Sequence, residues 1–218
     1  MQAKVAEVEG MEVCVAKTKY PQGGEKMLIQ RVLGRMVPSG KLPADVGAVV
    51  CNVSTVKAIS DAIRTGMPLV ERVTTVTGPY IPNPANFVVK IGTNAADLVA
   101  ACGGIQGDDV TVKAGGPMMG FIQQSIDFPI MKGSNGIIAV DTDHSEASEC
   151  IKCGRCADVC PMSLQPLYFA KLVGDPQALK ERNIMDCMEC RCCETICSAK
   201  IPLTTLIKMG KNAVRGMK

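Results

Sequence analysis

The chain has 218 residues, of which 47% are apolar, 21% are charged and 3% are aromatic, and its formal net charge is +3. This balance is typical of a globular protein with one large domain or two to three small ones. The few aromatic rings and the small net charge argue against a nucleic-acid-binding protein, and the chain contains neither an apolar run that could span a bilayer nor a secretory signal.

The first third of the chain predicts a small segment of mixed α and β structure. Alternating apolar residues indicate strands, and capping residues with glycine stops indicate helices. The expected elements are a strand over 11–18, a turn over 20–26, a helix over 27–33 ended by Gly34, a buried strand over 47–51, and a helix capped by Asn52 or Ser54 that runs to Arg64.

The middle of the chain reads as a mainly β unit. Strands are expected over 69–77, 86–91, 109–113 and 136–140, with a helix from Thr93 or Asn94 to Ala101. The glycine-rich stretch 115–120 lacks the Lys-Ser/Thr pair of a P-loop and the G-x-G-x-x-G pattern of a dinucleotide fold. It therefore predicts a tight turn.

Cysteine is the unusual residue of this sequence. Nine of the 12 cysteines lie between Cys150 and Cys197. Eight of them form two C-x2-C-x2-C-x3-C motifs, a first motif over 150–160 and a second motif over 187–197. A secreted disulfide scaffold would spread its cysteines through the chain. Clustered cysteines without a signal peptide instead favour metal ligation in a reducing compartment.

The spacing of the two motifs predicts two [4Fe–4S] clusters. Three cysteines separated by two residues can wrap one loop around three corners of an iron–sulfur cube, and the fourth cysteine of each motif points away and serves the other cluster. Cluster 1 is therefore expected to bind Cys150, Cys153, Cys156 and Cys197, and cluster 2 to bind Cys187, Cys190, Cys193 and Cys160.

A zinc site is the alternative interpretation of these cysteines. Zinc usually takes two C-x2-C pairs in a tetrahedron, and the third and fourth cysteines of each motif exceed that requirement. Cys192 lies beside Cys193 and is expected to be a buried thiol that binds no metal. Cys14, Cys51 and Cys102 are interpreted as inert core thiols, and His144, the only histidine, as a solvated linker residue.

The rest of the C-terminal region reads as helical. Helices are expected over 164–172 and 176–182, between the motifs, which favours an α-helical two-cluster ferredoxin module. Residues 200–218 predict a terminal helix with an apolar face and a basic face of Lys208, Lys211, Arg215 and Lys218. This helix would pack on the cluster module with its basic side in solvent, or dock to a membrane surface or an acidic redox partner.

The order of these features resembles the C subunit of the Rnf electron transport complex. The resemblance is carried by YPQGGEK at 20–26, LPADVG at 42–47, Asn52-Val53, GGPMMG at 115–120 and both cysteine motifs. It covers essentially the whole chain, which corresponds to the C-terminal half of that Rnf protein. Cobalamin reductases of bacterial microcompartments are also similar.

The resemblance implies an α+β multidomain fold of three parts. Residues 1–68 would be the closing part of a flavin- and NADH-binding α/β domain like the flavin subunit of complex I. Residues 69–142 would form a soluble-ligand-binding β-grasp (SLBB) domain, and residues 143–218 the α-helical two-[4Fe–4S] ferredoxin domain with the basic C-terminal helix.

The resemblance also implies a function. Such a protein lies peripherally on the cytoplasmic face of the bacterial membrane, receives electrons from NADH through FMN or exchanges them with a ferredoxin or flavin carrier, and passes them to membrane subunits that translocate Na+ or H+. By resemblance, Glu25, Asn52, Ser54 and Thr55 would line the FMN, which requires the glycine-rich upstream half missing from this sequence. The chain alone is therefore expected not to be catalytic. A cobalamin reductase, or a partner-docking module stabilised by its metal sites, is the alternative.

Overall fold

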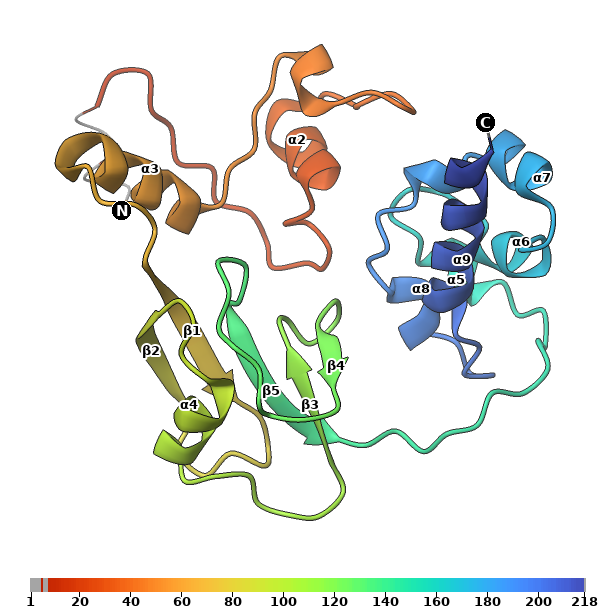
Figure 1. Cartoon of the computed structure of the whole chain (residues 1–218). Helices are drawn as coiled ribbons and strands as arrows, with labels where there is room; N and C mark the ends of the chain where they lie inside the picture. The colour runs from red at the N-terminus through yellow and green to blue at the C-terminus, as the bar shows by residue number, and fades with distance from the viewer. Residues whose placement is uncertain (1–4, 6–7, 218) are drawn as a thin grey trace.

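The computed structural model describes residue 5 and residues 8–217, and it has three parts. Figure 1 shows an N-terminal helical segment, a five-stranded sheet and a helical unit that contains the cysteine motifs. An extended segment links the sheet to the helical unit. Within the described residues, no helix has the length and apolar character needed to cross a bilayer.

The N-terminal segment is built from short helices and has almost no core of its own. Its elements are α2 (Glu25–Leu33), the 3-10 turn η1 (Pro43–Val46) and α3 (Val53–Thr65). α2 ends at Gly34, whose left-handed φ of 65° lets the backbone leave the helix, as the sequence predicts. Among the described residues before the sheet, only Ile29 and Ala48 are buried hydrophobic residues. Most apolar side chains of this segment therefore face its surroundings.

Two strand predictions in this segment were wrong. Residues 11–18 are mostly exposed and form no strand, because no strand of the described chain lies beside them to share backbone hydrogen bonds. Residues 47–51 are not a buried strand either. Gly47 adopts a φ of 68° that closes η1, and Val49 is 84% exposed.

The three isolated cysteines differ in their burial. Cys102 is buried in the core of the sheet domain, as expected, whereas Cys14 and Cys51 are exposed. The interpretation of the last two as core thiols was wrong, because the strands that would have buried them do not form.

The central sheet has the strand order β2-β1-β5-β3-β4. The strands are β1 (Glu71–Thr77), β2 (Ala85–Lys90), β3 (Val110–Ala114), β4 (Phe121–Gln123) and β5 (Gly136–Asp141). β1 pairs antiparallel with β2 and parallel with β5, and β3 pairs antiparallel with β5 and with β4. This mixed order with one covering helix is the β-grasp arrangement that the resemblance implied. Only the short β4, after the confirmed 115–120 turn, was not predicted.

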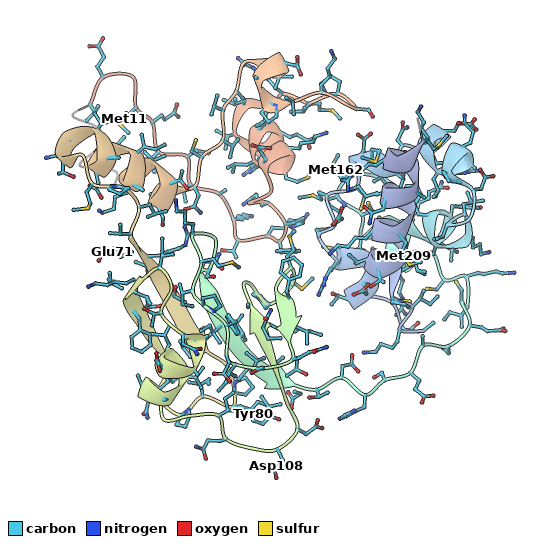
Figure 2. All side chains as sticks on the ribbon, viewed as in Figure 1. Met11, Glu71, Tyr80, Asp108, Met162 and Met209 are labelled. Atoms are coloured by element: carbon cyan, nitrogen blue, oxygen red, sulfur yellow. The ribbon has the colours of Figure 1, made fainter. Side chains whose placement is uncertain are left out.

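Helix α4 (Ala95–Ala101) covers one face of this sheet. Asn94 caps the helix, because its side-chain oxygen accepts the Ala96 N–H at 3.0 Å. The core between helix and sheet contains Val76, Val89, Leu98, Val99, Val112 and Ile137. In Figure 2, Glu71 marks the end of the sheet nearer the N-terminal segment and Tyr80 the far end.

The helical unit is organised around its last helix. Its elements are α5 (Arg155–Asp158), α6 (Pro166–Lys171), α7 (Pro176–Glu181), the 3-10 turn η2 (Ile184–Asp186), α8 (Cys192–Thr195) and α9 (Leu203–Gly216). The sequence predicts α6, α7 and α9 but not the single-turn helices α5 and α8. The shared core consists of Phe169, Leu179, Ile184, Cys193, Leu203, Ile207 and Val214. It places α9 against both α6 and α7.

The basic face expected on α9 is only partly present. Arg215 is exposed and Lys208 is partly exposed, but Lys211 is 6% exposed, so the prediction that it faces solvent was wrong. Lys211 is buried because its ammonium group has polar partners inside the unit, as described below. Lys218 lies outside the described residues.

The segment between the sheet and the helical unit contacts both of them. Asp143 forms an ion pair with Lys200, with 3.0 Å between Oδ2 and Nζ. The Ser148 N–H donates to the Ala199 carbonyl at 2.9 Å. His144 is exposed, as predicted, and its Nε2 lies 2.6 Å from Asp109 Oδ2.

Gly78 provides a test of how tightly the sheet is packed after β1. Its φ is 130°, and a Cβ at this position would collide with the backbone of Ala139 in β5. We expect Gly78→Ala to destabilise the sheet domain by about 3 kcal/mol, because neither the backbone angle nor the neighbouring strand can adjust cheaply. Urea unfolding followed by circular dichroism measures this change.

Gly133→Ala is the matched control for that substitution. A Cβ at Gly133 would meet nothing within 4 Å, so we expect a change within about 0.5 kcal/mol. Equal unfolding midpoints for the two variants would contradict the tight packing of Gly78 against β5.

Candidate metal centres

The eight motif cysteines surround two cavities in the helical unit. The first cavity is lined by Cys150, Cys153, Cys156 and Cys197. The second cavity is lined by Cys160, Cys187, Cys190 and Cys193, and also by Cys192. Each cavity thus gathers three successive cysteines of one motif and the last cysteine of the other motif.

The same backbone conformation shapes both ligand loops. Lys152 and Glu189 occupy equivalent positions of the two motifs, and each adopts a left-handed φ of 57°. This turns their N–H groups back onto the first cysteine of the motif. The Lys152 N–H donates to Cys150 Sγ and the Glu189 N–H to Cys187 Sγ, both at 3.4 Å. Hydrogen bonds of this kind stabilise a thiolate ligand.

A second left-handed residue starts the short helix after each loop. Gly154, with a φ of 80°, precedes α5, and Arg191, with a φ of 64°, precedes α8. These helices carry the third cysteine of each motif, Cys156 and Cys193, toward its cavity. Glycine adopts this backbone angle at little cost, whereas arginine pays a steric penalty.

Burial changes the acidity of the thiols. Burial raises the pKa of Cys193 to about 12 and also raises the pKa values of Cys156 and Cys187. Cys190 and Cys193 are buried, whereas Cys153 is exposed. Without metal, Cys156, Cys187 and Cys193 are protonated at neutral pH, so iron bound in the cavities would have to displace their protons.

The second cavity contains an unpaired hydroxyl group. Thr204, in the first turn of α9, lines this cavity and is 4% exposed, and its Oγ1 is buried with no hydrogen-bond partner in the described part of the chain. A buried hydroxyl without an acceptor is costly. A sulfur atom of a cluster bound beside it would supply that acceptor, so the polar lining of the cavity fits an iron–sulfur group.

A single zinc ion fits the arrangement less well. Zinc requires four ligands that converge on one point, with sulfur about 2.3 Å from the ion. Among residue 5 and residues 8–217, no three His, Cys, Asp or Glu side chains converge in a way that could hold one metal ion.

Cys192 is buried beside the ligand loop of the second motif. Burial, together with the neighbouring Cys190 thiol, raises the pKa of this thiol to about 11. Its burial confirms that part of the sequence interpretation. That it binds no metal stays a prediction.

The second motif contacts the N-terminal segment, and α9, which follows it, contacts the sheet domain. The Tyr20 hydroxyl donates to the Cys190 carbonyl at 2.8 Å, and Met188 lies against Gly24 of the same N-terminal turn. From the sheet domain, the Phe121 ring lies under Lys208, with 5.5 Å between Nζ and the ring centroid. The sequence carries no signal for these contacts, because their partners are far apart along the chain.

The four residues expected to line FMN are all exposed, at the starts of α2 and α3. Glu25 is the exposed first residue of α2, and Asn52, Ser54 and Thr55 are exposed at the start of α3. Asn52 rather than Ser54 caps α3, because its side-chain oxygen accepts the Ser54 N–H at 2.9 Å. Within the described chain, no hydrogen bond or ion pair joins Glu25 to the other three. These residues alone therefore do not enclose a flavin.

Family models match three successive stretches of the sequence. The Nuo51 FMN-binding domain matches residues 1–61, the SLBB domain residues 73–122, and a 4Fe–4S dicluster domain residues 124–165. The last match contains the first cysteine motif and ends before the second.

Curated relatives share high identity over most of this chain. The C subunit of the proton-translocating ferredoxin:NAD(+) oxidoreductase complex of Clostridium ljungdahlii is 50% identical over 82% of the chain and 41% of the relative. The C subunit of the Na(+)-translocating complex of Acetobacterium woodii is 43% identical over 81% and 39%. The C subunit of the ion-translocating oxidoreductase complex of Pseudomonas aeruginosa is 41% identical over 91% and 26%.

The chain spans less than half the length of each of these three relatives. Its two cysteine-lined cavities, its β-grasp sheet and its flavin-domain segment are the features that the matched families predict. Together with the sequence identity, they show that the chain belongs to the family of C subunits of ion-translocating ferredoxin:NAD(+) oxidoreductase (Rnf) complexes and corresponds to a portion of such a protein.

Proposed function

We propose that this chain relays electrons through two [4Fe–4S] clusters inside an Rnf-type membrane redox complex. The observation that carries the proposal is the pair of matched cavities, each lined by four cysteines from both motifs. A [4Fe–4S] cluster supplies one-electron transfer when it is bound. The protein residues hold the clusters side by side, limit their contact with water and set their potentials.

The proposed ligand sets follow the lining of the cavities. Cluster 1 is held by Cys150, Cys153, Cys156 and Cys197, and cluster 2 by Cys187, Cys190, Cys193 and Cys160. The proposed domain division is 1–68, 69–142 and 143–218. It is supported by the sheet, which runs from Glu71 to Asp141, and by the exposed segment that follows it.

The proposed electron input is the remainder of a Nuo51-like FMN-binding domain. Helix α3 exposes an unpartnered apolar face formed by Val56, Ile59 and Ile63, which are 51%, 52% and 80% exposed. A helix with such a face normally packs against a partner. The match of residues 1–61 to an FMN-binding domain supports the rest of that domain as the partner. In that assembly Glu25, Asn52, Ser54 and Thr55 would complete the flavin site.

The proposed partners and location follow from the relatives. Those proteins are named as subunits of ferredoxin:NAD(+) oxidoreductase complexes that translocate ions. We therefore propose that this chain docks peripherally on membrane subunits at the cytoplasmic face, receives electrons from NADH through the flavin domain, and exchanges them with a ferredoxin or flavin carrier. The pocket-lining cysteines of both cavities would be the route through this chain.

Metal content is the first test of this proposal. Anaerobically purified chain should contain about eight iron and eight acid-labile sulfide per molecule, because each cavity offers four thiolates to one cube. Iron and sulfide assays measure this directly. One or two zinc ions per chain without sulfide would refute electron relay and support a structural metal site.

The crossed ligand sets are tested by single cysteine substitutions. We expect Cys197→Ala to damage the cluster held by Cys150, Cys153 and Cys156, because that cube loses its fourth ligand. Iron content and electron paramagnetic resonance (EPR) of the reduced protein report the loss.

Two further variants make that test specific. Cys160→Ala should damage the other cluster, and Cys192→Ala should leave both intact, because Cys192 is proposed not to bind iron. If Cys197→Ala damaged only the cluster of Cys187, Cys190 and Cys193, the crossing would be wrong.

The dependence on a flavin domain gives a third test. The chain should exchange electrons with dithionite and viologens but should not reduce a viologen with NADH, because hydride transfer requires a bound flavin and a glycine-rich phosphate site. A full-length family member assayed alongside is the positive control. Robust NADH-dependent viologen reduction by this chain alone would contradict the proposal.

A further inference from the structure

The two cavities are built from equivalent positions of the two motifs but differ in their polar groups. Thr204 follows Cys187 by the same number of residues as Leu167 follows Cys150, so the two occupy equivalent positions after their motifs. Thr204 lines the second cavity and Leu167 lines the first. The second cavity therefore has a hydroxyl group where the first has an isobutyl group. In addition, the ammonium group of Lys211 contacts the ligand loop of the second cavity.

The Thr204 hydroxyl is held at the wall of the second cavity. Glu194 in α8 accepts the Thr204 N–H at 2.8 Å, which fixes the first turn of α9 against the ligand helix. The side chain is 4% exposed and its Oγ1 has no acceptor among the described residues. A hydroxyl in this position can donate to a sulfur atom in the cavity, and such a hydrogen bond stabilises the more negative state of a cluster.

Lys211 brings a buried positive charge to the same ligand loop. Its Nζ lies 2.8 Å from the Cys187 carbonyl oxygen and 2.6 Å from Glu189 Oε1. Its side chain is 7% exposed, whereas that of Lys208, whose Nζ lies 3.9 Å from Glu189 Oε2, is 40% exposed. A buried charge acts on its surroundings more strongly than a solvated one. Glu189 offsets part of this effect, and Lys208 adds to it.

We propose that Thr204 and Lys211 raise the reduction potential of the cluster in the second cavity and leave that of the first cluster unchanged. Reduction adds one negative charge to a cluster, and both a hydrogen bond to sulfur and a nearby ammonium group stabilise that charge. The first cavity has Leu167 at the position of Thr204. Arg155 and Ser198 also line it, but among the described residues no lysine ammonium group is hydrogen-bonded to its ligand loop as Lys211 is to that of the second cavity. This inference rests on the proposed clusters, and it assigns to two further residues the control of one of them.

The test is an EPR-monitored redox titration of the anaerobically purified full chain and its variants. Thr204→Val keeps the shape of the side chain but removes the donor, so the ratio of reduced to oxidised second cluster should fall about fivefold at a fixed potential. At 59 mV per tenfold, this is a shift of about 40 mV. Lys211→Met should lower the same ratio about tenfold, or about 59 mV.

Matched variants separate local tuning from general damage. Lys208→Met removes a positive charge from the same helix but leaves the buried contact of Lys211 with the ligand loop in place. The potential of the second cluster should therefore shift less than half as far as in Lys211→Met. Lys211→Arg keeps the positive charge, so the potential of the second cluster should stay close to the wild-type value. Leu167→Thr places a hydroxyl at the first cavity and should raise the potential of the first cluster alone. If Lys211→Met loses its cluster, Thr204→Val and Leu167→Thr still decide the question.

Iron and sulfide content is measured first. It distinguishes a failure of the proposed electron relay from a failure of the roles assigned to Thr204 and Lys211. A wild-type chain without iron and sulfide would overturn the proposed function itself. Variants that retain about eight iron atoms but show unchanged midpoints, or equal shifts of both clusters, would overturn only the roles of Thr204 and Lys211.

Discussion

The packing of α9 against α6 and α7 is the interaction on which both cysteine cavities depend. Leu203, Ile207 and Val214 recur on one face of α9 and meet Phe169 and Leu179 in a shared core. This contact fixes the chain between the two motifs to the chain after the second motif, and it brings the last cysteine of one motif beside the first three of the other. Without it the cysteines would remain two separate loops, because few other apolar contacts join them.

Much of the functional unit could be predicted from sequence, because cysteine spacing is a short-range signal. The grouping of the ligands, the helices between the motifs and the long strands each depend on residues close together in the chain. The strand predictions over 11–18 and 47–51 failed because alternation of apolar residues is not enough without a neighbouring strand. The burial of Lys211 could not be foreseen either, because its partner Glu189 belongs to the second motif.

Local sequence patterns could not predict the contacts among the three parts of the chain. The hydrogen bond from Tyr20 to the Cys190 carbonyl and the contact of Lys208 with Phe121 both involve the second motif or the helix behind it. The second motif and α9 thus form the side of the helical unit that meets the flavin-domain segment and the β-grasp sheet. Figure 1 shows the N-terminal segment and the sheet on the same side of that unit.

The sharing of cysteines between the motifs also has a consequence for biosynthesis. A ribosome releases Cys150, Cys153 and Cys156 well before it translates Cys197, so the first cavity has an open corner while the second motif is still being made. Neither cavity is complete until the second motif has emerged, and α9, which closes the unit, emerges later still. Cluster insertion therefore follows translation of the second motif, and a chain truncated within α9 would be released with thiols exposed to oxidation.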